Sequence, residues 1–226
     1  MVSIPVRREI PVSEKCYRCF RPLVSCYCGD IVTVETGIKF VFLMHPREAY
    51  RQKTGTGRLA ALSLADSEIL IGTDFTDNAR LNALIRDPRY APFVLYPSER
   101  ALVTDSPSFR AAVGQRIPLV ILIDATWFFA KKTLKASKNL HAIPALTFSA
   151  PYRSGFEFKT QPQPECLSTI ETAYYLVKEL QRAEVARKDA SPEPLMAVFR
   201  KMIEYQLACE QSRHEAEAAE LYPGLF

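Results

Sequence analysis

Several features are scarce in this sequence, and each absence excludes a class of protein. No apolar run approaches the roughly 20 residues of a membrane span, and residues 1–8 lack the apolar core of a signal peptide. Net charge is only +4, and glycine numbers eight in 226 residues, without internal repeats or low-complexity tracts. These absences argue against membrane and secreted proteins, and we expect a cytoplasmic protein. The small positive charge permits an RNA partner without requiring one.

The hydrophobic content and the length of the chain are typical of a folded globular protein. With 48% hydrophobic residues, the 226-residue chain can bury a full core. The length fits one large domain, or one domain with a small appendage.

Four of the six cysteines lie within thirteen residues, whereas Cys166 and Cys209 stand alone. In a cytoplasmic chain such a cluster favours a metal over disulfides. The spacing Cys-x2-Cys-x6-Cys-x-Cys suits tetrahedral zinc, and neighbouring basic residues would lower the thiol pKa values. An iron centre or redox thiols are the alternatives, and a four-thiolate site would be structural. The predicted ligands are Cys16, Cys19, Cys26 and Cys28.

Residues 119–123 form an unbroken apolar run, which is followed at once by Asp124, Ala125, Thr126 and Trp127. Such a run is typical of a strand buried on both faces, as in a parallel sheet covered by helices. Ligands of open α/β sheets bind outside the carboxyl ends of the strands. The polar residues after Ile123 are therefore candidate site residues.

Strand-like and helix-like segments alternate along the rest of the chain, which predicts an α/β fold with about five mostly parallel strands. Ser168 followed by Glu171 predicts a capping box at a helix start, although amides at such a start also suit an anion. The expected strands are 38–44, 68–72, 91–98, 119–123 and 144–149, and the expected helices are 46–55, 59–64, 126–138, 168–180 and 195–221, with 77–86 a polar helix or a loop.

Several motifs have two interpretations. A glycine-bearing loop at 53–58 suits phosphate or a simple turn, and His45 suits catalysis or a backbone contact. Lysines at 131, 135 and 138 form either a basic stripe or an ordinary solvated helix face. The segment 151–164 has alternating aromatic and polar residues and is expected to be an active-site loop.

Four motifs in order resemble the DTW-domain family, over residues 16 to 180. They are the cysteine cluster, His45-Pro46-Arg47-Glu48 with Gly55-Thr56-Gly57-Arg58, Asp124-Ala125-Thr126-Trp127, and Ser168-Thr169-Ile170-Glu171. Where many relatives carry asparagine before Thr-Gly, this chain has Gly55.

The resemblance implies a tRNA-uridine aminocarboxypropyltransferase, which moves the 3-amino-3-carboxypropyl group of S-adenosylmethionine onto N3 of a tRNA uridine. It also implies a knotted sheet related to the SPOUT methyltransferases. With the cysteine cluster, it predicts a zinc-binding knuckle over 1–36 and a catalytic α/β domain over 37–226. A SPOUT-type methyltransferase and a non-catalytic zinc-knuckle RNA-binding module are the alternatives.

Within that resemblance, Asp124 is the candidate for the general base at N3 or for the carboxylate that orients N3–H. Its alternative role is to cap the following helix. Expected cofactor-binding residues are Tyr96, Pro97, Ser98, Thr126, Trp127, Ser168, Thr169 and Glu171. The amides of Ser168 and Thr169 are expected at the methionine carboxylate, and Glu171 at its ammonium group. Expected RNA contacts are Arg18, Arg21, Arg47, Arg51, Arg58, Lys131 and Lys135.

Overall fold

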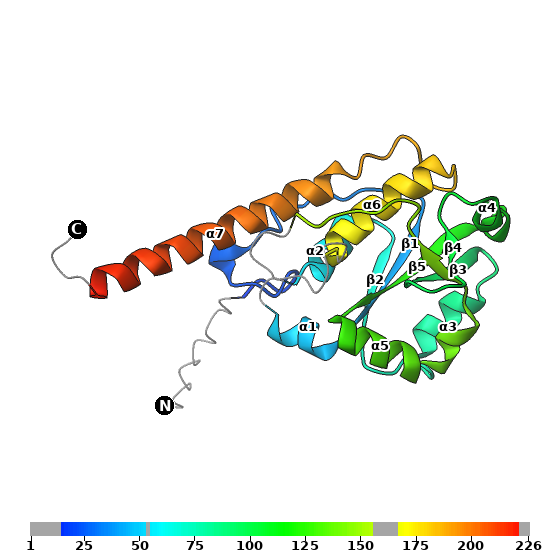
Figure 1. The fold of residues 1–226 in the computed structure, drawn as a ribbon, viewed down its shortest axis with the longest axis horizontal. Coiled ribbons are helices and arrows are strands. Elements are labelled where there is room, and N and C mark those ends of the chain that lie inside the picture. The colour runs from blue at the N-terminus through cyan, green and yellow to red at the C-terminus, as the bar shows by residue number, and fades with distance from the viewer. Residues whose placement is uncertain (1–14, 53–54, 156–166, 222–226) are drawn as a thin grey trace, which may run out of the picture.

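The computed structural model describes residues 15–52, 55–155 and 167–221 (Figure 1). In this part of the chain a six-stranded, all-parallel sheet has the strand order β2-β1-β5-β3-β6-β4. The strands are β1 (Lys39–Met44), β2 (Ser67–Ile71), β3 (Tyr90–Leu95), β4 (Leu102–Val103), β5 (Ile117–Asp124) and β6 (Ala145–Thr147). The expected α/β class is confirmed.

Helices connect the strands and cover the sheet on both sides (Figure 1). They are α1 (Pro46–Arg51), α2 (Gly57–Ser63), α3 (Ala79–Arg86), α4 (Pro107–Val113), α5 (Trp127–Ala136), α6 (Thr169–Arg182) and α7 (Glu193–Leu221), with short 3-10 helices at Leu23–Ser25 and Lys138–Ala142.

The central strands β1 and β5 explain the unbroken apolar runs of the sequence. Phe40 and Phe42 of β1 pack in one buried cluster with residues of α2, α4, α6 and α7. Val41 and Leu43 pack in a second cluster, with residues of α3 and the 3-10 helix after α5. Because successive side chains of a strand point to opposite faces, a strand covered on both sides needs apolar residues at every position.

Three sequence-based expectations are corrected at the element level. Helix α5 begins at Trp127 with Thr126 as its N-cap, so Asp124 does not cap it and remains the last residue of β5. Lys138 lies in the 3-10 helix beyond α5, so the basic stripe keeps only two of its lysines on α5. The sheet has six strands because β4, which was not expected, pairs with β6.

The cysteine-bearing segment, residues 15–28, is called the knuckle below. It packs against the sheet domain through α7: the Arg21 guanidinium lies 3.2 Å from the Met202 sulfur, and the Tyr27 ring contacts Tyr205 edge-on at 6.2 Å. Tyr27 also belongs to the buried cluster that covers one face of the sheet. Beyond these contacts α7 continues outward as a single helix (Figure 1). No helix among the described residues is long and apolar enough to span a membrane.

Candidate active site and metal centre

The four clustered cysteines bring their sulfurs together. All four Sγ atoms lie within 4.8 Å of one another, with Cys16 to Cys28 at 3.7 Å and Cys19 to Cys26 at 3.8 Å. Four sulfurs held about 2.3 Å from one tetrahedral ion would lie about 3.8 Å apart. The cysteines are not joined by disulfides. The donor set and its spacing therefore fit a metal with four thiolate ligands.

Backbone hydrogen bonds favour the thiolate form of Cys16, whereas burial raises the pKa of Cys19 and of Cys28. The turn is closed by hydrogen bonds from the Phe20 amide to the Cys16 carbonyl and from the Cys16 amide to the Arg21 carbonyl. Phe20 takes a left-handed conformation, with φ of 59°. Amides of Cys19 and Arg18 donate toward the Cys16 sulfur and lower its pKa to about 6. A lowered thiol pKa assists metal binding, since the thiolate is the ligand.

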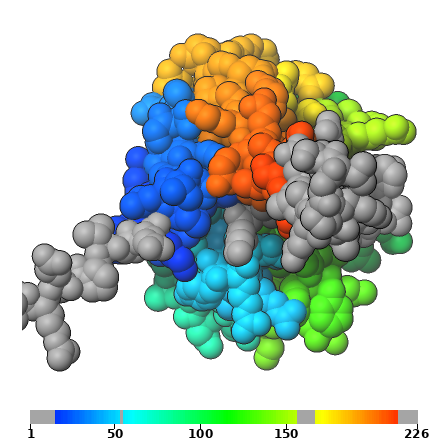
Figure 2. Space-filling model, turned by 90° about the vertical axis from the view of Figure 1, so that its left-hand side faces the viewer, coloured from blue at the N-terminus to red at the C-terminus, as the bar shows by residue number. Residues whose placement is uncertain are grey.

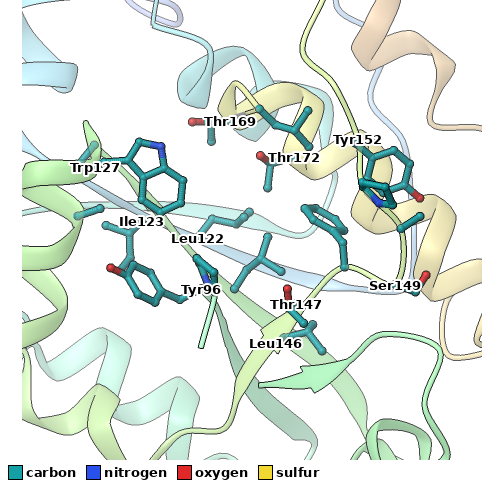
Figure 3. Close-up of a pocket in the computed structure, with 18 residues that line it drawn as sticks. Tyr96, Leu122, Ile123, Trp127, Leu146, Thr147, Ser149, Tyr152, Thr169 and Thr172 are labelled. Carbon is teal, nitrogen blue, oxygen red and sulfur yellow. The ribbon is translucent and has the colours of Figure 1, made fainter. Parts of the chain in front are cut away.

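A cavity of about 620 Å³ opens at the carboxyl ends of β3, β5 and β6. Figure 3 shows Trp127 and Tyr96 on one side of it and Tyr152 on the other, with Thr169 and Thr172 of α6 between them. No described lining residue carries a formal charge, so the walls are aromatic and aliphatic with a few hydroxyl groups. The volume is typical of sites for small molecules and cofactors.

Asp124 does not itself line this cavity, although its chain neighbours Ile123 and Ala125 do; it is buried at the end of β5, with 6% of its surface exposed. Its Oδ1 accepts a hydrogen bond of 2.6 Å from the hydroxyl of Thr169, which lines the cavity. Helix α2 begins against the same carboxylate: a Cβ on Gly57 would stand 2.0 Å from Asp124 Oδ2. The carboxylate is thus held between the starts of two helices.

Arg58, next along α2, faces the same carboxylate. Burial lowers the pKa of Arg58, and the charge of Asp124 opposes that effect. Its guanidinium carbon also lies 4.4 Å over the ring of Phe20. Arg58 therefore links the knuckle to the Asp124 site.

The predicted capping box at the start of α6 is confirmed. The Ser168 amide donates to Glu171 Oε2 at 2.8 Å. Glu171 is buried and also accepts from the Ser154 hydroxyl and the Gly155 amide. The Thr169 amide donates to the Thr56 hydroxyl at 3.1 Å. Both amides expected at a methionine carboxylate therefore already have partners within the protein, and Glu171 is surrounded by its own donors.

The segment 149–155 is held at one end by Glu171. A second buried glutamate of α6, Glu179, holds its other end. Its carboxylate accepts from the amides of Ser149 and Ala150 and from the hydroxyls of Thr104, Ser149 and Tyr152. Ser149, Ala150 and Tyr152 line the cavity. Sequence reasoning missed Glu179, because a glutamate within a helix is usually solvated and its partners are distant in the chain.

The structure brings together half of the expected cofactor-binding residues. Those lining the cavity are Tyr96, Pro97, Trp127 and Thr169, and those outside its lining are Ser98, Thr126, Ser168 and Glu171. Tyr152 of the expected active-site loop also lines the cavity, and lining residues that the sequence did not indicate include Ser149 and Thr172. Residues 156–164 of the expected active-site loop lie outside the described part of the chain, as do residues 53 and 54 of the glycine-bearing loop.

Six of the seven expected RNA contacts are at least partly exposed, but Arg21 is not. Arg21 is 7% exposed, burial lowers its pKa, and its guanidinium lies 4.8 Å over the Tyr27 ring. It holds the knuckle on α7 and is not available to a phosphate. For His45 the sequence left catalysis or a backbone contact as alternatives. Its side chain caps α1 by accepting a hydrogen bond from the Arg47 amide at 3.2 Å.

Together these features define an α/β protein with a parallel sheet, a cofactor-sized cavity at the carboxyl ends of its strands, and a four-cysteine knuckle that packs on α7 and contacts Arg58. The model of one family, the DTW domain, matches residues 13–207. The chain belongs to the DTW domain family.

Curated relatives match along most of the chain. A Drosophila melanogaster protein named tRNA-uridine aminocarboxypropyltransferase 2 is 27% identical over 211 residues, covering 90% of this chain and 79% of the relative. A Mus musculus protein of the same name is 24% identical over 219 residues, covering 92% and 70%. No solved structure matches the chain.

Proposed function

We propose that this protein is a tRNA-uridine aminocarboxypropyltransferase, which moves the 3-amino-3-carboxypropyl group of S-adenosylmethionine to N3 of a tRNA uridine. The observation that carries the proposal is the match to relatives of that name over 90% of the chain. The cavity beside Asp124 supports it, because it lies where open α/β sheets bind ligands. The relation to the SPOUT methyltransferases and the knot remain predictions from the resemblance.

The cavity fits the co-substrate in size and chemistry. Aromatic walls at Tyr96 and Trp127 suit a purine, and hydroxyls such as those of Thr169 and Thr172 suit a ribose or the amino acid end. S-adenosylmethionine would supply the electrophilic carbon next to its sulfonium: the new N3–C bond forms, the C–S bond breaks, and methylthioadenosine leaves with the electron pair. Of the expected cofactor residues, we retain Tyr96, Pro97, Trp127 and Thr169.

We assign Asp124 as the group that accepts the N3 proton or orients N3–H. Thr169 holds Oδ1 by a 2.6 Å hydrogen bond, which orients the carboxylate before the substrate arrives. Arg58 interacts electrostatically with the carboxylate, whose charge opposes the effect of burial on the pKa of Arg58. A base held in a set orientation satisfies the geometric requirement for proton transfer.

The knuckle is proposed to bind structural zinc, since four thiolates leave no open coordination position for chemistry. The proposed tRNA contacts are those of the expected basic residues that solvent reaches: Arg18, Arg47, Arg51, Arg58, Lys131 and Lys135. Such contacts position the RNA without selecting the base. The cytoplasm is the proposed location.

The experiment is a transfer assay with purified protein, unmodified tRNA and S-adenosylmethionine, with mass spectrometry of nucleosides and of the small product. Methylthioadenosine and a uridine heavier by one aminocarboxypropyl group are expected. S-adenosylhomocysteine would instead show methyl transfer. tRNA binding with no product of either kind would leave a binding module.

Asp124→Asn tests the assignment of the base. The asparagine side chain has nearly the same size as aspartate where it lies against Gly57, and its amide oxygen can still accept from Thr169. We therefore expect an unchanged melting temperature. Loss of the proton acceptor should lower kcat about 100-fold or more. Asp77→Asn, an exposed carboxylate elsewhere on the surface, is the matched control and should keep full activity. Full activity of Asp124→Asn would remove Asp124 from the mechanism.

A further inference from the structure

The exposed aromatic side chains of the described residues are not scattered over the surface. Every aromatic residue among the exposed large hydrophobic side chains belongs to the knuckle or follows β1 or β5, with exposed fractions from 46% to 81%. They are Tyr17, Phe20, Tyr50, Trp127 and Phe128. Single exposed apolar residues are ordinary, but a gathered set indicates a binding surface.

Contacts between elements bring together the segments that carry these residues. The ring of His45, which precedes α1, stacks on Phe129 of α5 at 4.2 Å, and Arg47 of α1 lies 4.9 Å over the same Phe129 ring. Arg58 of α2 joins the knuckle through Phe20. Figure 2 shows the knuckle, α1 and α5 side by side on the face at the left of Figure 1.

This face, called the aromatic–cationic face below, carries positive charge beside its rings. Besides the two arginine pairs, the Lys132 ammonium lies 4.3 Å over the ring of Phe128. Helix α5 carries three lysines and no acidic residue. A cation over an exposed ring keeps its charge in water while the ring covers its apolar stem.

The combination of exposed aromatic rings and cations favours single-stranded nucleic acid over a protein or an RNA duplex as the partner of this face. The centre of a protein–protein interface is depleted of lysine, which disfavours a second copy of the chain or another protein. Single-stranded nucleic acid matches both features, since bases stack on aromatic rings while cations track the phosphates. A regular RNA duplex keeps its bases stacked inside and would meet only the cations.

We propose that the aromatic–cationic face binds an unpaired segment of the RNA substrate by stacking its bases on Tyr50 and Phe128. The inference rests on the proposed function, and the chemistry of that function agrees with it. N3–H of uridine is a Watson–Crick donor, so a uridine that reacts at N3 is unpaired. The face leads to Asp124: α5 follows β5 directly, and Arg58, which lies over Phe20 of the knuckle, interacts electrostatically with Asp124.

The test measures binding by fluorescence anisotropy, without S-adenosylmethionine, of an oligouridine ten-mer and of a fully paired RNA duplex. The double variant Tyr50→Leu/Phe128→Leu keeps apolar side chains and removes both rings. It should bind the ten-mer about 100-fold more weakly, at about tenfold per lost stack, and bind the duplex as wild type does. Leu207→Ala, which trims an exposed apolar residue of α7, is the control and should bind as wild type.

Salt dependence separates stacking from charge. The double variant should keep the wild-type slope of log Kd against log salt, because a base that stacks on a ring neutralises no phosphate and so releases no counterion. Arg47→Gln should instead reduce the slope by about 0.7 for one lost single-strand phosphate contact.

Unchanged ten-mer affinity in the double variant would overturn the proposal. So would equal weakening for the duplex, or self-association of wild type that the variant abolishes. If wild type binds the ten-mer through these rings but releases no methylthioadenosine with any tRNA, the proposed function fails and the binding face stands.

Discussion

Gly57→Ala is the substitution for which two physical rules predict opposite signs. Gly57 is the first residue of α2. Alanine is the better helix former, and by propensity alone the change should stabilise the protein by about 0.5 to 1 kcal/mol. The structure opposes this, because the new Cβ would lie 2.0 Å from Asp124 Oδ2 and 2.5 Å from its Cγ.

The steric effect should win. The neighbouring atoms are a buried carboxylate at the end of a central strand, so the strain cannot relax into solvent. Overpacking of this kind costs about 1 to 3 kcal/mol. Displacing the carboxylate also weakens the Thr169 hydrogen bond, and bonds to charged groups contribute about 1.5 to 3 kcal/mol. After the propensity gain, we expect a net loss of about 2 kcal/mol, and a Tm lower by about 4 to 8 °C for a chain of this size.

Thermal denaturation and the transfer assay on the same preparations check this prediction. Gly55→Ala is the matched control, because the nearest atom to its added Cβ would lie at 3.6 Å. It should keep wild-type Tm and activity, whereas Gly57→Ala should lose stability and turnover together. A Gly57→Ala protein as stable as Gly55→Ala, with full activity, would refute the close approach of α2 to Asp124.

Three further predictions concern other parts of the molecule. Cys16→Ser should lose bound metal and lower Tm together, as measured by elemental analysis and calorimetry; a folded, metal-free variant with unchanged Tm would contradict the metal centre. Glu179→Gln replaces an acceptor-only carboxylate with an amide whose NH2 group would face donors, and should destabilise by about 2 kcal/mol or more and raise KM for S-adenosylmethionine; an unchanged urea midpoint and KM would argue against its role in the cavity wall. Hydrogen bonding by Arg80, with help from Lys39, lowers the pKa of Glu68 from 4.5 to about 2, so its stabilisation should be complete above pH 4.5 and disappear as the pH falls to about 2. Urea midpoints of Glu68→Gln should therefore lie below wild type at pH 6 and converge with it near pH 2; a constant difference would contradict the lowered pKa.

Local patterns predicted the parts of the fold that depend on local physics. The apolar run before Asp124 predicted a strand covered on both faces, and the spacing of Ser168 and Glu171 predicted a helix start, because burial and capping are visible in short windows. Helix α4 also had such a signal, Ser106 followed by Pro107, with the Ser106 hydroxyl accepting from the Phe109 amide. The expected elements nevertheless leave out α4 and the two-residue strand β4 before it.

Contacts between residues far apart in the chain could not be predicted from such short windows. Gly57 faces Asp124 across 67 residues of chain, and Thr104 reaches Glu179 across 75. Arg21 shows the opposite error: a basic residue within a cysteine knuckle suggested a surface charge, but α7, which covers it, lies at the far end of the chain. Residue type indicates the chemistry available, and the packing decides whether solvent or a ligand can reach it.

The two buried glutamates of α6 have a consequence for how the cavity responds to a ligand. Glu171 and Glu179 lie eight residues apart, about 12 Å along the helix axis, and hold the two ends of residues 149–155. The cavity wall cannot pull away without breaking hydrogen bonds to α6. Occupation of the cavity should therefore slow amide hydrogen exchange along α6, including turns that no ligand touches.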